Sequence, residues 1–327
     1  MSNKSTAEAP ANIAFIKYWG VKDEVLRLPA NGSISMNLSN LLTITTVEFN
    51  NSFKEDAVIV DGKKESIKSN RVIKHINRIR KLAKIRSKVK VVSENNFPSS
   101  TGLSSSASGF AALTLAAIST SGLDFSEKDL SILARLGSGS ACRSIPDGFV
   151  EWVESNTHET SYAKSLFPPD YWDIVDVVVV VSSDKKDISS TEGHKFAGTS
   201  IFFEKRMEII NEKIKTIKEY MEKKNFKAFG ELIEKEALEL HAIYLTSSPS
   251  LIYLTPESLC VIREVKKWRD KGILVYFTLN TGQDVHLICE KKNARKVANL
   301  AEKIEGVKKT IINYPSVGAK LSNKHLF

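Results

Sequence analysis

"PSSTGLSSSASG", residues Pro98 to Gly109, carries seven hydroxyl side chains in twelve residues and lies directly before the Ala-rich run "FAALTLAAIS". The stretch is too polar for a buried segment and is flanked by apolar ones, so it predicts a surface loop that leads into a helix beginning near Leu103 or Ser104. The free N–H groups and partial positive charge of a helix N-terminus bind phosphate, while hydroxyls add donors and can ligate Mg²⁺. The loop therefore predicts a phosphate site. N-cap and turn roles explain only one or two of the serines.

The loop differs from the best-known phosphate motifs. It lacks the G-K-[ST] ending of a Walker A loop and the G-x-G-x-x-G pattern of dinucleotide-binding proteins. The chain also has no G-x-S-x-G elbow, which argues against a serine hydrolase.

Composition limits the classes of protein to consider. The 327 residues, 42% of them hydrophobic, fit one large or two ordinary domains with a proper core. Lys and Arg exceed Asp and Glu by 47 to 38, and the net charge of +9 favours anionic partners such as nucleic acid, phosphorylated metabolites or acidic surfaces. The three cysteines, Cys142, Cys260 and Cys289, have no CxxC spacing and are expected to be reduced thiols.

Apolar runs such as 177–181 are too short to span a bilayer, and the N-terminus "MSNKSTAEAP" has no signal-peptide core. We therefore expect a cytoplasmic protein without a membrane partner. Nucleic acid is not expected as a partner either, because the aromatic residues are not interleaved with basic residues on strands as stacking platforms require. A basic nucleic-acid-binding protein is the alternative from another functional class.

Strand-like and helical patterns alternate along the first part of the chain. Strand-like runs occupy 11–19, 42–49, 56–62, 88–97, 148–155 and 173–183, and helical patterns occupy 66–85, 103–119 and 126–137. Long amphipathic helices are then expected at 200–223, 226–244 and 256–271, followed by strands at 272–280 and 284–290, a helix, and a strand at 307–313. The sequence predicts an α+β protein of two lobes, 1–187 and 188–327, with the seam near 184–190, where charges and hydroxyls interrupt the pattern.

A second hydroxyl-rich turn, "GSGSACRSIPDGFVEW" at 137–152, adds the guanidinium of Arg143. Arginine can grip a carboxylate or a phosphate through two hydrogen bonds, and Ser138 and Ser140 offer neutral donors beside it. The alternative is that the glycines end the preceding helix and that Arg143 is a surface charge.

A third stretch, "NIAFIKYWG", places Lys17 beside Tyr18 and Trp19 at the end of an apolar strand. Aromatic neighbours of a lysine in a strand ordinarily indicate packing. By itself this stretch assigns no function.

Taken in order and with their spacing, these stretches resemble the mevalonate diphosphate decarboxylases of the GHMP kinase superfamily over nearly the whole chain. The segments "IKYWG" and "SGSACRS" are the most specific, and "VVVVSSDKKDISSTEGH" and "ELHAIYLTSSPSLIYLTPES" match further blocks. The resemblance implies that ATP phosphorylates the 3-hydroxyl of mevalonate 5-diphosphate, after which phosphate and CO2 leave to give isopentenyl diphosphate. It also implies a homodimer with a two-lobed GHMP kinase fold: an N-terminal ribosomal protein S5 domain 2-like lobe, a C-terminal ferredoxin-like α/β lobe, and the active site in the cleft.

The resemblance also implies roles for individual residues. The residues expected to line the substrate pocket are Ala11, Asn12, Lys17, Tyr18 and Trp19, with Lys17 near the diphosphate or the transferring phosphate. The residues expected to hold the substrate's phosphates and carboxylate are Ser138, Ser140 and Arg143. ATP is assigned to Ser99, Ser100, Gly102, Ser104, Ser105, Ser106, Lys185 and Ser189, and Mg²⁺ to Ser105 and Ser106. Lys186 and Ser190 fall in the same loop as Lys185, which in relatives approaches the nucleotide.

Two positions depart from the family pattern. Where the family usually reads G-K, this chain has Gly20-Val21-Lys22, which leaves the role of Lys22 open. The family's motif D-A-G-P-N, whose Asp faces the 3-hydroxyl, corresponds to "TLNTGQD". A gap-free alignment places Asn280 on that Asp, and a slip of one residue would place Thr281 there.

No carboxylate stands immediately before Gly282, and Asp284 lies on the far side of the turn. One alternative is that another acid, such as Asp284, fills the gap and that the chain is a full decarboxylase. Because a related branch, the mevalonate 3-kinases, also lacks the Asp and stops after phosphorylation, we expect 3-hydroxyl kinase activity with weak or absent decarboxylation. Another alternative is a mevalonate 3-kinase-like enzyme that acts on mevalonate or its 5-phosphate.

Overall fold

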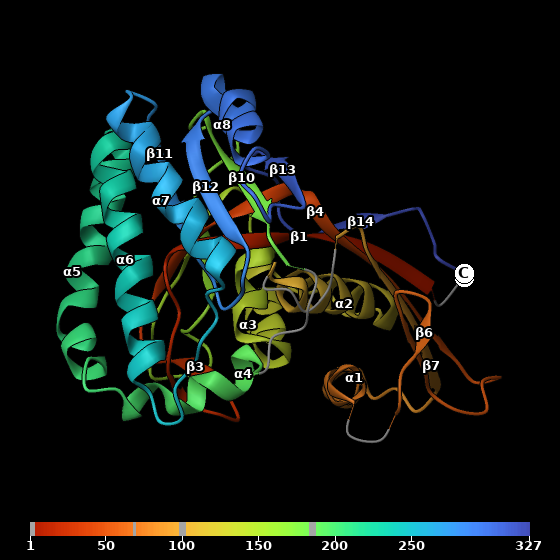
Figure 1. The fold of residues 1–327 in the computed structure, drawn as a ribbon. Helices are drawn as coiled ribbons and strands as arrows, with labels where there is room; N and C mark the ends of the chain where they lie inside the picture. The colour runs from red at the N-terminus through yellow and green to blue at the C-terminus, as the bar shows by residue number, and fades with distance from the viewer. Residues whose placement is uncertain (1–3, 68–69, 98–102, 183–187) are drawn as a thin grey trace.

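Two β-sheets meet at the centre of the molecule, and the helices cover their outer faces (Figure 1). The structure is a computed structural model that describes residues 4–67, 70–97, 103–182 and 188–327. The first sheet has the order β14-β1-β4-β7-β5-β6, with β8 paired to β4 and β9 paired to β8. Its strands are β1 (Lys4–Ile16), β4 (Ser33–Asn50), β5 (Ala57–Val60), β6 (Lys63–Lys64), β7 (Lys88–Asn95), β8 (Phe149–Trp152), β9 (Ala163–Phe167) and β14 (Lys320–Ser322).

The second sheet has four antiparallel strands in the order β11-β12-β10-β13. Its strands are β10 (Ile174–Val180), β11 (Val275–Thr278), β12 (Val285–Glu290) and β13 (Lys309–Asn313). A separate hairpin joins β2 (Val21–Asp23) to β3 (Leu28–Pro29). The α-helices are α1 (Arg71–Ala83), α2 (Ser105–Ser121), α3 (Glu127–Gly137), α4 (Ser190–Gly193), α5 (Phe203–Glu222), α6 (Phe226–Thr246), α7 (Pro256–Asp270) and α8 (Ala294–Ala301). Short 3₁₀ turns are η1 (Gly139–Ser144), η2 (His194–Thr199) and η3 (Lys291–Asn293).

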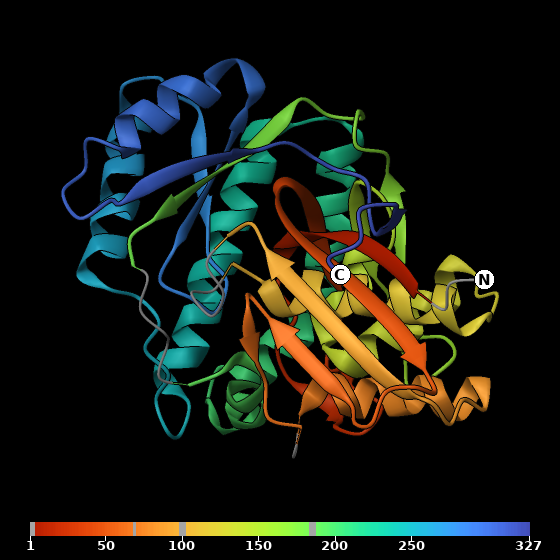
Figure 2. The same cartoon turned by 90° about the vertical axis from the view of Figure 1, so that its right-hand side faces the viewer.

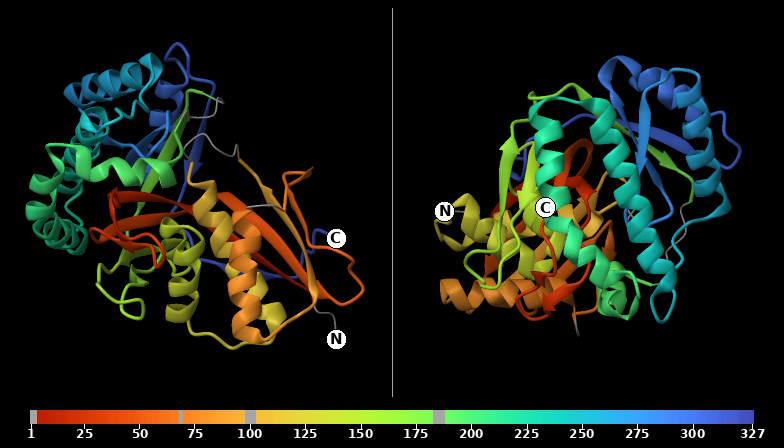
Figure 3. Two further views of the ribbon diagram at one scale, coloured as in Figure 1. Left: turned by 90° about the horizontal axis from the view of Figure 1, so that it is seen from below. Right: turned by 90° about the vertical axis from the view of Figure 1, so that its left-hand side faces the viewer.

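Helices α1, α2 and α3 lie on one face of the first sheet (Figures 2 and 3). The central helix α2 is apolar on nearly all sides, as its Ala-rich sequence requires for a helix enclosed by β1, β4 and its helical neighbours. It begins at Ser105, close to the start expected from the serine-rich loop. The five loop residues 98–102 lie outside the described residues.

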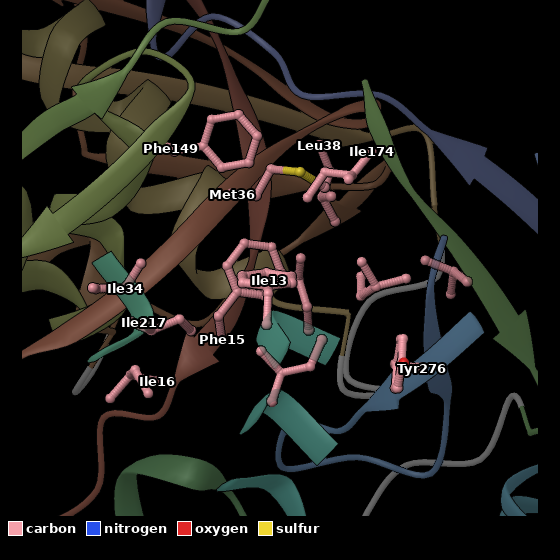
Figure 4. Close-up of a cluster of buried hydrophobic side chains, with 14 of the residues drawn as sticks. Ile13, Phe15, Ile16, Ile34, Met36, Leu38, Phe149, Ile174, Ile217 and Tyr276 are labelled. Atoms are coloured by element: carbon pink, nitrogen blue, oxygen red, sulfur yellow. The ribbon is translucent and has the colours of Figure 1, made fainter. Parts of the chain in front are cut away.

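Strand β10 joins the two halves of the core. Side chains alternate across a strand, so Ile174 and Val178 face the cluster that contains Met36 and Leu38 of β4, as Figure 4 shows for Ile174. The odd-numbered valines of β10 face the opposite side and pack against α7 and α8. Burial on both faces explains the unbroken valine run.

The sheets divide the chain differently from the expected boundary at residue 187. Strand β10 precedes that boundary, yet it pairs with β12 and β13 of the second sheet. The C-terminal strand β14 returns to pair with β1 of the first sheet. The seam near 184–190 is a break in local pattern, whereas sheet membership depends on which distant strands supply hydrogen-bond partners.

The other elements expected from periodicity are present, with ends moved by a few residues. Helix α1 begins at Arg71 because the side chain of Asn70 caps it by accepting from the Val72 N–H. Strands β9 and β14 and the β2–β3 hairpin are short and were not expected. In the described part of the chain, no helix combines the length and apolar character that crossing a membrane requires.

Candidate active site

A cavity of about 490 Å³ opens where both lobes contribute to one wall. Its lining comes from the end of β1, the N-terminus of α2, η1, the segment around α4, helix α6 and the loop after β11. The polar and charged residues that line it are Lys17, Tyr18, Arg27, Arg71, Ser104, Ser105, Ser106, Ser138, Ser140, Arg143, Ser189, Ser190, Thr191, Glu192, His194, Tyr244, Asn280 and Thr281.

Charge in this wall is strongly asymmetric. Lys17, Arg27, Arg71 and Arg143 face the cavity, and among the described lining residues Glu192 is the one carboxylate. Arg71 also donates to the Gly137 carbonyl at 2.9 Å. Its pKa is lowered to about 10 by burial and by the nearby charge of Arg27. A cavity built this way attracts a polyanion.

The N-terminus of α2 presents free donors to the cavity. Ser104, the N-cap residue, has a left-handed φ of 62° and makes no side-chain cap bond. Its hydroxyl instead faces Asn280, whose Nδ2 lies 3.3 Å away. Ser105 and Ser106 form the first turn of the helix. The 17-residue helix α2 directs its dipole and unpaired N–H groups at the same space.

Lys17 is buried at the inner end of the cavity. Its Nζ donates to the Ala14 carbonyl at 2.5 Å and lies 3.4 Å from Asn280 Oδ1. Burial, more than any neighbouring charge, lowers the pKa of Lys17 to about 7, and Glu236 opposes that shift. Lys17 can therefore lose or gain a proton near neutral pH.

The backbone of Lys17 is fixed by a buried ionic cluster. Glu236 accepts from the Lys17 N–H at 3.0 Å, and its carboxylate pairs with Arg206 at 2.5 Å and Lys213 at 3.0 Å. Arg206 and Asn31 both donate to the Lys17 carbonyl, at 3.0 and 2.8 Å. Helices α5 and α6 and the segment between β3 and β4, which contains Asn31, thus hold the lysine in position.

Arg143 lines the cavity from η1 and is only 4% exposed. Nη1 donates to Ser33 Oγ at 2.9 Å, and Nη2 donates to Asn12 Oδ1 at 3.0 Å. Asn12 in turn donates to Ser144 Oγ at 2.8 Å. The guanidinium is thus oriented by two polar side chains, one of which is itself held by Ser144. The alternative that Arg143 is a surface charge is wrong.

Asn280 and Thr281 both line the cavity but face different partners. Asn280 lies between Lys17 and Ser104. The Thr281 hydroxyl hydrogen-bonds to Ser190 instead. The residue that faces both the buried lysine and the helix N-terminus is therefore Asn280. Asp284 is 3% exposed, and its Oδ1 accepts from the Val181 N–H at 3.0 Å.

Three residues expected in the pocket wall lie behind it. Ala11 is fully buried in the main core, and Asn12 supports Arg143 from behind. Trp19 packs edge-on against Tyr244, and its ring lies tilted against that of His194 at a centroid distance of 4.4 Å. Strand β1 has register shifts between Pro10 and Asn12 and between Ala14 and Ile16, and it ends at Ile16, so simple alternation from the motif does not predict which of these side chains face the cavity.

The other expected site residues divide into two groups. Those that line the cavity are Lys17, Tyr18, Ser104, Ser105, Ser106, Ser138, Ser140, Arg143, Ser189, Asn280 and Thr281. Those that lie outside the described residues are Ser99, Ser100, Gly102 and Lys185.

Sequence reasoning missed Arg27, Arg71, Glu192 and His194. His194 Nδ1 accepts from the Gly20 N–H at 3.1 Å, and its ring lies 4.2 Å from that of Tyr18. Glu192 and His194 belong to the segment "VVVVSSDKKDISSTEGH", whose match to the family is a signal that could have identified them. Nothing local distinguished Arg27 or Arg71 from the many other basic residues of the chain.

Two family models cover most of the chain. Residues 9–163 match the diphosphomevalonate decarboxylase-like N-terminal domain, and residues 176–323 match the mevalonate 5-diphosphate decarboxylase C-terminal domain. The chain belongs to the diphosphomevalonate decarboxylase family.

Relatives support the same assignment. The diphosphomevalonate decarboxylase of Debaryomyces hansenii is 37% identical over 321 residues, which cover 91% of this chain and 82% of the relative. The diphosphomevalonate decarboxylase of Rattus norvegicus is 37% identical over 284 residues, or 80% of this chain and 70% of the relative.

Solved structures of diphosphomevalonate decarboxylases confirm the two-lobed GHMP kinase fold. The enzyme from Staphylococcus aureus has a TM-score of 0.93 at 36% identity, covering 99% of both chains. A structure of MDDEF in complex with MVAPP, AMPPCP and magnesium has a TM-score of 0.92 at 36% identity, covering 98% of this chain and 99% of the other.

Proposed function

We propose that this member of the diphosphomevalonate decarboxylase family binds Mg²⁺–ATP and mevalonate 5-diphosphate in the 490 Å³ cavity and phosphorylates the substrate's 3-hydroxyl. Release of CO2 and phosphate, which would give isopentenyl diphosphate, is slow or absent. The observation that carries this proposal is Asn280, a neutral side chain between Lys17 and the N-terminus of α2.

The nucleotide side of the cavity is the N-terminus of α2. Ser104, Ser105 and Ser106 offer hydroxyls beside the free N–H groups, a combination suited to phosphate oxygens. Mg²⁺ usually keeps several waters and binds through substrate phosphates with one or two protein oxygens. The hydroxyls of Ser105 and Ser106, with the Glu192 carboxylate in the same cavity, fit that requirement. When bound, the ion would neutralise charge on the transferring phosphoryl group.

The substrate side is the wall formed by η1 and the end of β1. Arg143 is held with its guanidinium towards the cavity, and Ser138 and Ser140 lie beside it. This group suits a carboxylate or phosphate, which accepts several hydrogen bonds at once. Lys17, deeper in the wall, is placed to stabilise negative charge during phosphoryl transfer.

The neutral side chain of Asn280 affects phosphoryl transfer and decarboxylation differently. Phosphoryl transfer has a loose transition state, so the attacking hydroxyl need not lose its proton early, and a missing base is tolerated. In the decarboxylation, phosphate leaves a tertiary carbon and positive charge develops there. A fixed carboxylate would stabilise that charge, whereas a neutral amide does so far less. Asp284 is engaged with the backbone of Val181 and does not line the cavity.

A mevalonate 3-kinase-like activity on mevalonate or its 5-phosphate is the second candidate. The same neutral Asn280 favours it, because such an enzyme has no decarboxylation step to support. The two candidates differ in their preferred substrate. The expected homodimer is a further proposal, which sedimentation of the purified chain would test.

The test incubates the purified chain with ATP, Mg²⁺ and mevalonate 5-diphosphate and measures ADP and CO2 separately. Mevalonate and mevalonate 5-phosphate are run in parallel. We expect ADP formation to exceed CO2 release clearly, with mevalonate 5-diphosphate as the best substrate. Faster turnover of mevalonate or its 5-phosphate would favour the 3-kinase-like candidate.

Two variants test whether the family's aspartate carboxylate belongs at position 280 or at position 281. Asn280→Asp is expected to raise CO2 release, because the new carboxylate would lie near Lys17 and Ser104. Thr281→Asp is the matched control, since that side chain faces Ser190. Equal release of CO2 and ADP by the unaltered chain would refute the proposal that phosphorylation outpaces decarboxylation. An increase in CO2 release only in Thr281→Asp would show that position 281, not 280, corresponds to the family's aspartate.

A further inference from the structure

Beside the main cavity lies a second one of about 820 Å³, and the two share Tyr18, Arg27, Thr191 and His194. These four residues form the part of the wall that is common to both cavities, which we call the passage. Arg27 is the one lysine or arginine among these four residues. Its position allows it to contact a ligand group that extends from the main cavity into the second.

The other cations of the second cavity are already neutralised. Lys22 pairs with Glu154, and Lys195 lies 3.6 Å from Glu24, with all four residues in the cavity's own wall. Arg27, by contrast, has no hydrogen-bond or ion-pair partner for its guanidinium within the described residues. It is the one cation of this wall that remains available to an anionic ligand.

The backbone at Arg27 is unusual. Its φ is 50°, in the left-handed region where glycine or asparagine is the usual choice. A long cationic side chain at this position is conformationally unfavourable. Such outliers persist where surrounding structure fixes them, and they concentrate at functional sites.

The surrounding structure does fix this turn. Asp23 Oδ1 accepts from the N–H groups of Val25 and Leu26, both at 2.8 Å. The Leu26 carbonyl accepts from Arg135, a fully buried arginine of α3, at 3.0 Å. The residue before Arg27 is thus tied to the core, and the residue after it pairs in the β2–β3 hairpin. Arg27 is therefore presented from a rigid turn.

The charge of Arg27 also acts on its surroundings. It lowers the pKa of Arg71 on the nucleotide side and opposes the rise in the Tyr18 pKa that burial causes. Both residues line the main cavity. Phosphate bound between them would relieve the repulsion between Arg27 and Arg71.

From this geometry we infer that Arg27 is a specificity-determining residue that binds the terminal phosphate of the substrate's 5-diphosphate, at the passage between the two cavities. The inference rests on the proposed function, because it assumes a phosphorylated substrate in the main cavity. Lys22 is held by Glu154 and Asn156 and does not line the main cavity, so Arg27 is the one lysine or arginine of the described residues that lines both cavities.

The test compares Arg27→Asn and Arg27→Lys with the unaltered chain. Asparagine tolerates a positive φ, so Arg27→Asn removes the charge while keeping the turn. Lysine keeps the charge but loses the two-pronged hydrogen bonding. The matched control is Arg78→Gln, which removes a partly buried positive charge that interacts with Arg27 but lines neither cavity. Thermal unfolding verifies that each variant is folded.

Two measurements are made on each protein. The first is KM and kcat for mevalonate 5-diphosphate, mevalonate 5-phosphate and ATP, from ADP formation. The second is calorimetric binding of mevalonate 5-diphosphate and of inorganic diphosphate, without turnover. We expect Arg27→Asn to weaken binding of mevalonate 5-diphosphate by roughly 10- to 100-fold, the range for losing a charged hydrogen-bond pair. The affinity of Arg27→Lys for mevalonate 5-diphosphate should lie between those of Arg27→Asn and the unaltered chain. The KM for ATP should change little in both variants.

The outcomes separate this inference from the proposed function. Loss of preference for the diphosphate over the monophosphate in Arg27→Asn, with Arg78→Gln unchanged, supports the inference. Three results overturn it: an equal loss of this preference in Arg27→Asn and Arg78→Gln, a rise in Arg27→Asn that is confined to the KM for ATP, or unchanged binding of mevalonate 5-diphosphate by Arg27→Asn. If the unaltered chain binds mevalonate 5-diphosphate without forming ADP, the proposed function fails while the binding test of Arg27 still stands.

Discussion

Lys17 is the residue whose chemistry depends most on its surroundings. Its pKa of about 7 results from burial, partly offset by the carboxylate of Glu236. We therefore expect kcat/KM to fall as pH rises through about 7, because the free enzyme then loses the cation that stabilises the phosphoryl group. Glu236→Gln should move that fall to lower pH. A pH–rate profile of kcat/KM for both proteins checks this.

Lys17→Arg is the control for the assignment, because arginine stays charged over the whole range and the fall near neutral pH should disappear. Glu236→Gln leaves Arg206 and Lys213 with a weaker buried partner, at a cost of up to about 3–5 kcal/mol, so its profile is measured where it is folded. An unchanged midpoint in Glu236→Gln would contradict the role given to that carboxylate.

The same pKa has a consequence for stability. Between about 7 and the ordinary value of 10.5, Lys17 is protonated in the unfolded chain and largely deprotonated in the folded one. The unfolded state then binds more protons, so this residue makes the folded state more stable as pH rises through that window. Urea unfolding at several pH values should show this rise in the free energy of unfolding for the unaltered chain but not for Lys17→Met.

At the residue scale, the motifs predicted which residues lie near the site better than they predicted which way the side chains point. Lys17, Arg143 and Asn280 were singled out from short motifs, and all three line the cavity. Asn12 and Trp19 belong to the same motif as Lys17 but lie behind the wall. A motif shows which residues are near a site. The side that a strand residue such as Asn12 occupies depends on the twist and bulges of β1, which has register shifts at this end, whereas Trp19 follows the end of the strand at Ile16.

Among the elements, helix α2 carries the clearest functional prediction. Ser105→Ala or Ser106→Ala should weaken handling of Mg²⁺–ATP by about 1.5–3 kcal/mol, because each hydroxyl lost is a potential donor to a charged phosphate. Steady-state kinetics with varied ATP and titration with a non-hydrolysable nucleotide give the measurement.

Ser121→Ala, at the opposite end of the same helix, is the matched control. Its hydroxyl donates to the Ile118 carbonyl and accepts from the Leu123 N–H, and the residue does not line the cavity, so its removal should leave nucleotide binding unchanged. Normal nucleotide affinity and turnover in both Ser105→Ala and Ser106→Ala would count against a nucleotide role for the loop.

Element prediction succeeded where periodicity is local and strong. The apolar run of α2 and the valine run of β10 identify both elements from sequence. The three-residue strand β14 has no such signal. It forms because β1 presents a free edge to it. The paired residues are more than 300 positions apart in the sequence, so no local pattern predicts the pairing.

At the scale of the whole molecule, one core couples the two sheets. Ile174 of β10 is fully buried between them. Ile174→Ala should lower the free energy of unfolding by about 2–5 kcal/mol through lost burial and the cavity left behind. Urea unfolding followed by tryptophan fluorescence and by residual activity measures the effect, and both signals should be lost together.

Ile201→Ala is the comparison, because Ile201 is 80% exposed and its truncation should change the free energy of unfolding by no more than about 0.5 kcal/mol. Separate transitions for fluorescence and activity would show that the lobes unfold independently, contrary to a shared core.

The sequence by itself determined the alternation of helices and strands, the serine-rich entry to α2 and the family, because periodicity and motif spacing are properties of neighbouring residues. The tertiary structure decided which side chains share the cavity. Lys17 and Glu236 are 219 residues apart, and the lysine's pKa depends on that contact and on burial. Arg27 faces both cavities only because its hairpin is tied to α3. Burial and distant charge pairs arise from packing, so no local pattern encodes them.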